Sequence, residues 1–274
     1  MTRNDIIKEL ERRGYEAESC DNIKNGVVFE GIIIKGKQLS PIIYTEKLIE
    51  DAEKNGRNVY SVASQVMDIY EWNDDKEISI ELLCSKEFFL NHVYIGIQKK
   101  SEEDIEKRDC ELDSDGLENY LIIKYTGDDG VCSMKVNDYF LKKVGIERAE
   151  AWKKAMQNVC DDTVIESMNR ILSEMLGIPY DADADLKNPL YIVSSSDKVK
   201  GASAILNHEK LKKFGKKHGV NKILVLPSSI HEMLISPYQD WMDIDEMKAI
   251  VTEINAVEVT PEERLTDQAY IINL

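Results

Sequence analysis

Residues 190–235 read LYIVSSSDKVKGASAILNHEKLKKFGKKHGVNKILVLPSSIHEMLI, and apolar runs alternate along them with polar loops and one lysine-rich segment. Residues 208–218 have the spacing of an amphipathic helix, with Leu211 and Phe214 on its inner face. The runs rich in β-branched residues and leucine predict three strands, at 190–194, 223–226 and 230–235. The last third of the chain is therefore expected to combine a sheet with packed helices.

Residues 243–257 carry the most regular helical pattern in the chain, capped by Asp243. Its apolar stripe is expected to face the core and consists of Ile244, Met247, Ile250, Val251 and Ile254. A capping box of Thr163 and Glu166 predicts another helix over 163–176. Further helices are predicted from Thr2 to Gly14 and at 46–55, 58–72 and 147–160. Further strands are predicted at 27–34, 42–44, 92–98, 120–125, 131–136 and 269–272.

Strands and helices come in runs along this chain and do not alternate strictly. This order predicts an α+β fold with mixed or antiparallel sheets and packed helices. Gly177 to Pro189, which contains an Asp-Ala-Asp-Ala-Asp stretch, is the best candidate for a linker. We therefore expect an N-terminal α+β region at 1–178 and a C-terminal α+β region at 186–274 that carries the Leu-Pro-Ser-Ser-Ile-His-Glu tract. The alternative is one continuous domain in which N-terminal strands complete the last sheet.

The composition is that of a globular protein. The chain has 274 residues, of which 43% are hydrophobic and 31% are charged. No apolar run approaches the roughly 20 residues that a membrane-spanning helix needs. The N-terminus is charged throughout and lacks the apolar stretch of a secretory signal. These features predict a cytoplasmic protein without a membrane anchor.

Acidic residues dominate the charge balance and give a formal net charge of −16. Because phosphate affinity comes from lysine and arginine, direct nucleic-acid binding is not expected. Residues 101–120 hold nine acids against Lys107 and Arg108, and 161–185 hold seven against Arg170, whereas 207–222 is rich in lysine. The acidic runs fit ordinary solubilising surface, a docking surface for a basic partner, or mimicry of DNA.

Metal and cofactor motifs are missing from the sequence. The five cysteines lie far apart, so neither a disulfide framework nor a zinc site is expected. His231-Glu232 begins like the zinc motif HExxH, but Ile235 stands where the second histidine would be. No GxGxxG and no GxxxxGK[ST] occurs. We therefore predict no metal and no cofactor.

The tract Leu226–Glu232 invites a catalytic interpretation. Ser228 or Ser229 would act as nucleophile, His231 as base and Glu232 as the group that orients the base. However, in a strand over 230–235 the side chains of His231 and Glu232 would point to opposite faces. The alternative is a turn at Pro227 in which the hydroxyls satisfy backbone groups.

The loop after the strand at 190–194 is the second candidate, with Ser196 and Gly201 as its ligand-binding residues. Small and hydroxyl-bearing residues there resemble a phosphate loop only loosely. This loop, the Pro-Ser-Ser turn and the lysine-rich helix 208–218 could together hold an anion at one end of the sheet. The alternative for the lysines is the solvated face of a helix whose other face packs inward.

Several tracts recur in a fixed order and resemble a bacterial domain-of-unknown-function family common in gut-dwelling anaerobes. They are Gly31–Ile34, Ser40–Tyr44, Ala151–Asn158, Gly201–Leu206, Leu226–Glu232, Val251–Asn255 and Glu262–Tyr270. The resemblance implies a bacterial, cytosolic module of this full length, with some relatives on mobile elements. It implies no activity, cofactor or catalytic residue.

Two function classes follow from these observations, and the sequence leaves open whether the chain is an enzyme. The first is an acidic interaction or regulatory protein without catalysis, which binds a protein partner and is linked to mobile elements. The second is a protein that binds a small anionic ligand, or a hydrolase, using the turn at Ser228, Ser229 and His231. A pocket where these groups converge would favour the second class.

Overall fold

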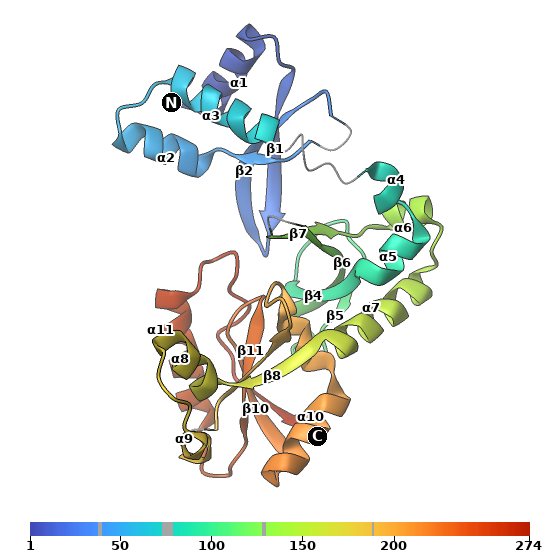
Figure 1. Ribbon diagram of the computed structural model, residues 1–274, viewed down its shortest axis with the longest axis vertical. Helices are drawn as coiled ribbons and strands as arrows, with labels where there is room; N and C mark the ends of the chain where they lie inside the picture. The colour runs from blue at the N-terminus through green and yellow to red at the C-terminus, as the bar shows by residue number, and fades with distance from the viewer. Residues whose placement is uncertain (38–39, 73–78, 128–129, 188) are drawn as a thin grey trace. The chain divides into compact units, whose positions relative to one another are not determined.

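The computed structural model describes residues 1–37, 40–72, 79–127, 130–187 and 189–274. It confirms the α+β fold, with helices packed on three antiparallel sheets (Figure 1). The described chain divides into two compact units, Met1–Ser85 and Lys86–Leu274. This division differs from the expected boundary at 177–189, because that segment connects two paired strands of one sheet inside the second unit.

The first unit packs helices on a small three-stranded sheet. Its main hairpin turns at Asn25 and Gly26, whose φ angles of 48° and 82° are those of a type I′ turn. Isoleucines of the hairpin are buried against the helices, Ile32 and Ile34 among them. Its elements are α1 (Arg3–Arg12), β1 (Ala17–Lys24), β2 (Val27–Ile34), β3 (Ile43–Tyr44), α2 (Glu46–Lys54), α3 (Val59–Trp72) and α4 (Ile80–Leu83).

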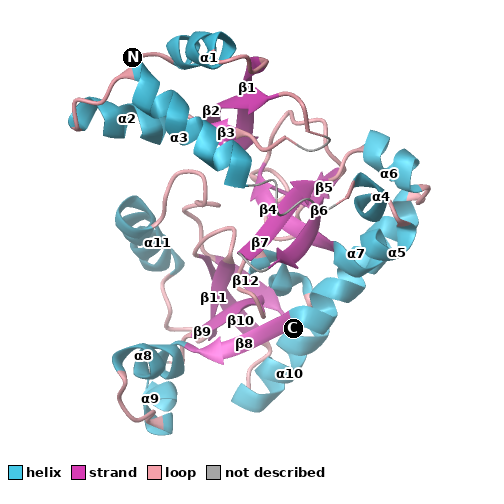
Figure 2. Ribbon diagram, turned by 45° about the horizontal axis from the view of Figure 1, so that its top comes forward, coloured by secondary structure: helices cyan, strands magenta, loops and turns pink. Residues whose placement is uncertain are grey.

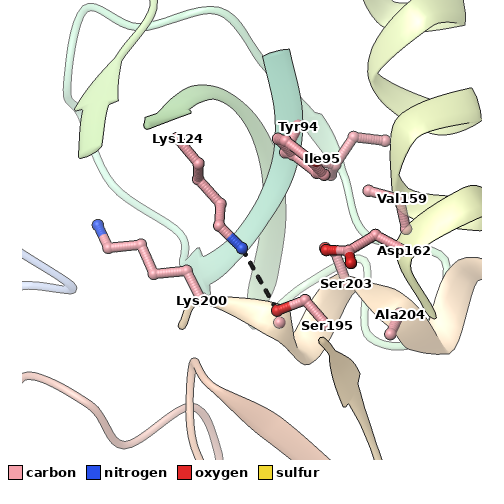
Figure 3. Close-up of a pocket in the computed structure, with 10 residues that line it drawn as sticks. Tyr94, Ile95, Lys124, Val159, Asp162, Ser195, Lys200, Ser203 and Ala204 are labelled. Carbon is pink, nitrogen blue, oxygen red and sulfur yellow. Dashed lines mark hydrogen bonds between the residues drawn. The ribbon is translucent and has the colours of Figure 1, made fainter. Parts of the chain in front are cut away.

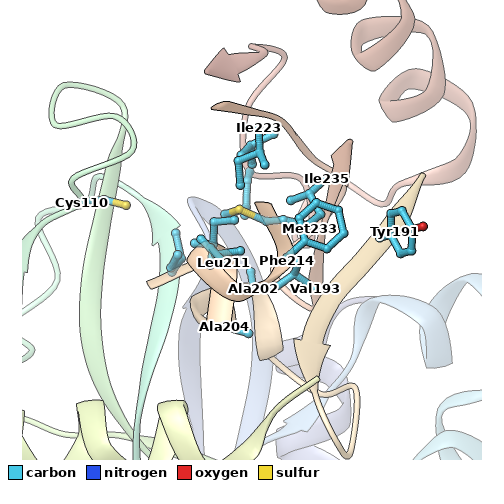
Figure 4. Close-up of a cluster of buried hydrophobic side chains, with 14 of the residues drawn as sticks. Cys110, Tyr191, Val193, Ala202, Ala204, Leu211, Phe214, Ile223, Met233 and Ile235 are labelled. Carbon is cyan, nitrogen blue, oxygen red and sulfur yellow. The ribbon is translucent and has the colours of Figure 1, made fainter. Parts of the chain in front are cut away.

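A five-stranded antiparallel sheet forms one half of the second unit, in the order β12-β10-β11-β9-β8. Its inner face packs against α10 (His208–His218) and the 3₁₀ helix η2 (Gly201–Leu206), and Figure 4 shows Leu211, Phe214, Val193, Met233 and Ile235 meeting there. The strands are β8 (Thr163–Ser167), β9 (Tyr191–Ser195), β10 (Lys222–Pro227), β11 (Glu232–Pro237) and β12 (Tyr270–Asn273). The lysine-rich segment is thus a helix with its apolar side in the core, as predicted.

A second antiparallel sheet in this unit is built around β6, which pairs with β4 along one edge and with β5 and then β7 along the other (Figure 2). Helix α7 packs on β4, and α5 packs on α7 and β6. The strands are β4 (Val93–Lys99), β5 (Lys107–Asp109), β6 (Leu117–Gly127) and β7 (Gly130–Lys135). The helices of the unit, besides α10, are α5 (Lys86–His92), α6 (Asp138–Val144), α7 (Arg148–Asp162), α8 (Met168–Leu176), α9 (Ala182–Lys187) and α11 (Ile244–Glu258).

The predicted helix over 163–176 is wrong in its first five residues. Thr163 to Ser167 form β8, which pairs residue by residue with β9, and the helix begins only after Ser167. The Ser167 hydroxyl accepts the Arg170 amide at 3.2 Å and caps it. The first three residues of the strand, Thr163 to Ile165, are β-branched and suit a pleated, half-buried surface. Pairing with β9 therefore outweighs the capping-box signal.

The predicted stripe of helix 243–257 is only partly correct. Within α11, Val251 and Asn255 are buried, while Ile250 and Ile254 are exposed. The pattern correctly indicated a helix, but half of its apolar face does not reach the core.

Tyr270 ties β12 to the loop that precedes β6. Its hydroxyl donates to Asp113 Oδ2 at 2.6 Å, and this hydrogen bond lowers the pKa of Asp113 despite partial burial. We expect Tyr270→Phe to reduce the free energy of unfolding by about 1.5–3 kcal/mol at pH 7, since the lost hydrogen bond has a charged acceptor. Urea denaturation measures the loss.

The same pair predicts a pH dependence. A lowered pKa means that the bond's contribution is fully present above the ordinary pKa of an aspartate, about 4, and is lost as the pH falls through the folded-state pKa. The difference between wild type and Tyr270→Phe should therefore shrink in acid. Tyr238→Phe is the control, because among the described residues the Tyr238 hydroxyl makes no hydrogen bond. A difference that stays constant from pH 7 to pH 3 contradicts the assignment.

Candidate functional site

The two tracts singled out in the sequence meet in the structure. Ser194 Oγ donates to the His231 carbonyl at 2.7 Å, and the Ala202 amide donates to the Ile230 carbonyl at 3.2 Å. A third hydrogen bond, 3.1 Å long, joins the Lys200 amide to His231 Nδ1. The loop after β9 and the turn after β10 therefore form one connected region, here called the loop–turn region (residues 194–203 and 227–232).

The loop holds an uncommon backbone conformation. Lys198 and Lys200 have φ angles of 55° and 50°, in the left-handed region that residues with a side chain rarely occupy. The loop is held by hydrogen bonds from the Lys198 amide to the Ser195 carbonyl and from the Val199 amide to Asp197 Oδ1, both 3.0 Å long. Such strain persists only where the surroundings over-determine it, and it concentrates at functional sites.

Gly201 lies where the loop passes closest to β9. A Cβ atom at this position would stand 2.4 Å from Ser194 Oγ and from the Ser195 amide nitrogen. Because real Cβ atoms do not approach so closely, only glycine fits here. The structure therefore explains Gly201 by its close packing against β9.

His231 is held by both ring nitrogens. Nδ1 accepts the Lys200 amide, so the neutral ring carries its proton on Nε2, which faces Glu263 Oε1 at 3.3 Å. In a serine hydrolase, one ring nitrogen of the histidine faces a carboxylate and the other faces the serine hydroxyl. In His231 the nitrogen that does not face Glu263 is occupied by the Lys200 amide. Among the residues described, the hydroxyl nearest in sequence, Ser229 Oγ, instead accepts the His231 backbone amide at 3.1 Å.

The other predicted site residues lie in the loop and the turn around this histidine. Ser229 is buried, and its amide donates to the Glu232 carbonyl at 3.2 Å; Ser228 is half-buried in the same turn. Burial raises the pKa of Glu232, against the opposing effects of Lys198 and His231. The Ser196 amide and hydroxyl both donate to Asp162. Of the lysine-rich helix, Lys210 reaches the Thr163 carbonyl.

A buried ammonium group lies beside the loop–turn region, and the sequence analysis missed it. Lys124, on β6, has a side chain only 4% exposed, and its Nζ is 2.9 Å from Asp197 Oδ1. Its Nζ also lies 3.3 Å from Ser195 Oγ, and Figure 3 shows this second contact. Ser195 Oγ also donates to Asp197 at 2.7 Å, and Nζ lies 5.0 Å from the centre of the Tyr94 ring. A single lysine between the apolar run Leu121-Ile122-Ile123 and Tyr125 was the available signal.

The Asp197 carboxylate is the acceptor that these groups share. Burial alone would raise its pKa, but hydrogen bonds from Lys124, Ser195 and the Val199 amide outweigh burial, and the pKa lies below its ordinary value. The cavity beside Lys124 is lined by Tyr94, Asp162 and Ser203 among others and has a volume of about 10 Å³ (Figure 3). That is the lower limit, about 10–15 Å³, for a single water molecule. These contacts join the loop to the sheet that contains β6, and this one cavity is too small for a substrate.

In the described parts of the chain, no group of three or more histidine, cysteine or acidic side chains is placed to hold a metal ion. Within the same residues, no helix is long and apolar enough to cross a membrane.

Helix α11 presents an apolar stripe to solvent. Ile250, Ile254 and Val257 are 39%, 44% and 75% exposed, and their spacing of four and three residues places them on one side of the helix. Val251 and Asn255, each one residue after a stripe residue, lie about 100° further round the helix and are its buried residues. An exposed apolar stripe on an ordered helix is typical of a protein-binding surface.

The fold and these sites define an acidic α+β protein in which the loop–turn region is tied to a neighbouring sheet and helix α11 exposes three apolar side chains. The chain belongs to the family of unknown function DUF5688, whose model matches residues 2–273. Neither the comparison with curated proteins nor the comparison with solved structures found a match.

Proposed function

We propose that this chain is a bacterial, cytoplasmic interaction protein without catalysis, and that α11 binds a basic amphipathic helix of a protein partner. The observation that carries the proposal is the exposed stripe of Ile250, Ile254 and Val257. A helix laid along such a stripe buries apolar surface on both partners, which is the usual driving force for helix-in-groove recognition.

Acidic residues flank the stripe and indicate the charge of the partner. Glu246 lies four residues before Ile250, Glu253 four before Val257, and Glu258 four after Ile254. Side chains four residues apart are neighbours on a helix surface, so each stripe residue has a carboxylate beside it. A second copy of this chain would bring like charges together, whereas a partner rich in lysine or arginine would meet opposite charges.

Mimicry of DNA has less support among the interaction functions. Of the nine acids in 101–120, four point inward to partners within the protein. Trp152 binds Glu106 at 2.9 Å, Lys135 binds Glu103 at 2.6 Å, Gln98 binds Glu118 at 2.8 Å, and Tyr270 binds Asp113. Fewer acids of this run are therefore left to imitate a row of phosphates.

The small-anion or hydrolase alternative also has less support. His231 is engaged at both ring nitrogens, and the adjacent cavity is at the size limit of one water molecule. Binding of a partner on α11 requires neither a free histidine nitrogen nor a larger cavity.

A designed peptide tests the proposal. We expect a leucine–lysine amphipathic helix to bind the purified protein, with an affinity that falls as salt is added, because part of the attraction is between exposed charges. A peptide with the same leucines and glutamate in place of lysine should not bind. Fluorescence anisotropy of the labelled peptides, at several salt concentrations, measures both.

Matched variants locate the surface. The triple variant Ile250→Ser, Ile254→Ser, Val257→Ser should weaken binding at least about tenfold, which corresponds to about 1.4 kcal/mol, and should leave the unfolding transition nearly unchanged. The control removes three exposed side chains of α8, namely Leu172→Ser, Met175→Ser and Leu176→Ser. Equal losses in both variants, or binding of the acidic peptide, would overturn the proposal. So would a concentration-dependent dimer abolished by the α11 variant, because the stripe would then serve self-association.

A further inference from the structure

Strand β1 lies at an open edge of the three-stranded sheet in the first unit. The strand order is β1-β2-β3, so β1 has β2 on one side, and among the described residues no strand pairs with its other side. Seven of its eight residues are exposed or half-buried. An edge strand of this length offers a row of backbone donors and acceptors to another strand.

Alternate residues of β1 direct their backbone groups to that open side. The Lys35 amide donates to the Glu16 carbonyl at 2.8 Å, so Glu16 bonds inward to β2, and the antiparallel pattern repeats this at every second residue. On β2, the Glu30 carbonyl instead accepts the Thr45 amide from the β3 side at 3.0 Å, so its register partner Asp21 does not bond to β2. The odd-numbered residues of β1 therefore point their amides and carbonyls outward.

The charges along β1 are complementary to those of the same strand running in the opposite direction. In an antiparallel pair of two such strands with a twofold axis at Cys20, residues equally far before and after Cys20 face each other. Glu16 of each copy then faces Lys24 of the other, and Glu18 faces Asn22. Opposite charges that face each other across two strands stabilise the pair. In this register no charged side chain lies directly opposite one of its own sign.

The neighbouring registers are less favourable. An axis at Asp21 would place two Asp21 carboxylates directly opposite each other, which destabilises a strand pair. An axis at Ser19 would place Lys24 opposite Gly14, outside the strand, and both ion pairs would be lost. An axis between two residues is excluded, because an outward-bonding residue of one copy would then face an inward-bonding residue of the other.

We propose that β1 pairs with β1 of a second copy of this chain, in the register centred on Cys20, so that two three-stranded sheets join into one antiparallel sheet of six strands. The pairing gives hydrogen-bond partners to the outward amides and carbonyls and ion-pair partners to Glu16 and Lys24. It uses the first unit, whereas α11 lies in the second unit. Either this proposal or the docking surface on α11 can therefore fail while the other stands.

Cys20 at the axis makes the register testable by cross-linking. Cys20 bonds inward to β2, so it would face its copy in a pair without hydrogen bonds, with Cα atoms about 4.5 Å apart, inside the disulfide range of about 4.4–6.8 Å. We expect copper–phenanthroline, which oxidises adjacent thiols, to give a disulfide-linked dimer in wild type and in Cys132→Ser but none in Cys20→Ser. Cys132 is the control because it is exposed and Cys20 is half-buried, so random collisions would favour Cys132. A dimer that persists in Cys20→Ser, or no dimer in wild type, overturns the proposal.

Two charge variants separate pairing from folding. Glu16→Lys and Lys24→Glu should each weaken the dimer at least about tenfold in sedimentation equilibrium, because like charges then face each other at both ends of the pair. Mixing the two variants restores opposite charges at both ends, so a mixed dimer linked through Cys20 should form, identified by a size tag on one variant. Two misfolded variants would not rescue each other. Single variants that dimerise as tightly as wild type, or a mixture without mixed dimers, overturn the proposal.

Discussion

Gly201→Ala is expected to destabilise the protein by about 3 kcal/mol or more, at the upper end of the range for overpacking. The added Cβ would stand 2.4 Å from Ser194 Oγ and from the Ser195 amide nitrogen, and 2.5 Å from Ser195 Oγ. A hydroxyl can rotate away, but the amide nitrogen belongs to β9, where Ser195 pairs with Thr163. Relief therefore requires movement of a central strand of the sheet.

Backbone conformation does not contribute to this effect. The φ angle of Gly201 lies outside the left-handed region, so alanine is acceptable there on conformational grounds. Gly145 is the matched opposite case, with a φ of 73° at the end of α6 and no atom within 4 Å of an added Cβ. Gly145→Ala should cost only about 1–2 kcal/mol, the penalty for a left-handed residue with a side chain.

Urea denaturation of both variants compares packing with conformation. Gly201→Ala should be the more destabilised of the two, and its change should extend to the His231 ring signals in an NMR spectrum, because Lys200 precedes Gly201 and donates to Nδ1. A Gly201→Ala variant as stable as Gly145→Ala, with unchanged His231 signals, would show that the loop can move away from β9 at little cost.

Patterns local in sequence predicted most of the second unit. The helix at 208–218 has the predicted bounds. Leu211 and Phe214 supply its buried face, and Gly219 ends it in the left-handed conformation. The strand β1 was missed, since its residues Ala17–Lys24 are mostly polar. Asn25-Gly26 was the available signal, as this pair favours the type I′ turn that joins β1 to β2.

The site was less predictable than the fold. The proximity of Gly201 and His231 depends on the pairing of β9 with β11, and nothing in either tract specifies that partner. The contact between Lys124 and Asp197 joins two sheets and spans 73 residues of sequence. Ile250 and Ile254 of α11 were misassigned to the core because periodicity indicates that a helix has an apolar face, and does not indicate whether another element of the same chain covers all of it.

The second large effect is expected at Asp197. Asp197→Ala should lower the free energy of unfolding at pH 7 by about 3 kcal/mol, because it leaves a buried ammonium group without its carboxylate. The Lys124 side chain is 4% exposed and that of Asp197 is 25% exposed, so water can reach the carboxylate's place in part but not the amine. Asp162, the other carboxylate at the cavity, is already bound to Ser196.

A double-mutant cycle separates the ion pair from the loop contacts. Asp197→Asn keeps an acceptor for the Val199 amide and removes the charge, and Lys124→Met removes the ammonium group with a side chain of similar length. We expect each single variant to be destabilised and the double variant to recover most of the loss, since no unpaired charge then remains buried. Additive losses in the double variant would mean that the two residues act separately.

Acid should remove the same contribution. The pKa of Asp197 is lower in the folded protein than its ordinary value, so the pair contributes fully above about pH 4, the unfolded value, and its contribution disappears as the pH falls through the folded-state pKa. Wild type and Asp197→Asn should therefore converge in stability towards pH 2, measured by urea denaturation across that range.

Because the carboxylate also accepts the Val199 amide between the two left-handed lysines, its protonation should loosen the strained loop before the rest of the fold. Protection factors against amide exchange that fall in acid at Val199 and Lys200 before they fall at β10 would support this order. Simultaneous loss of protection would mean that the loop and the sheet unfold as one unit and that Lys124 stabilises both together.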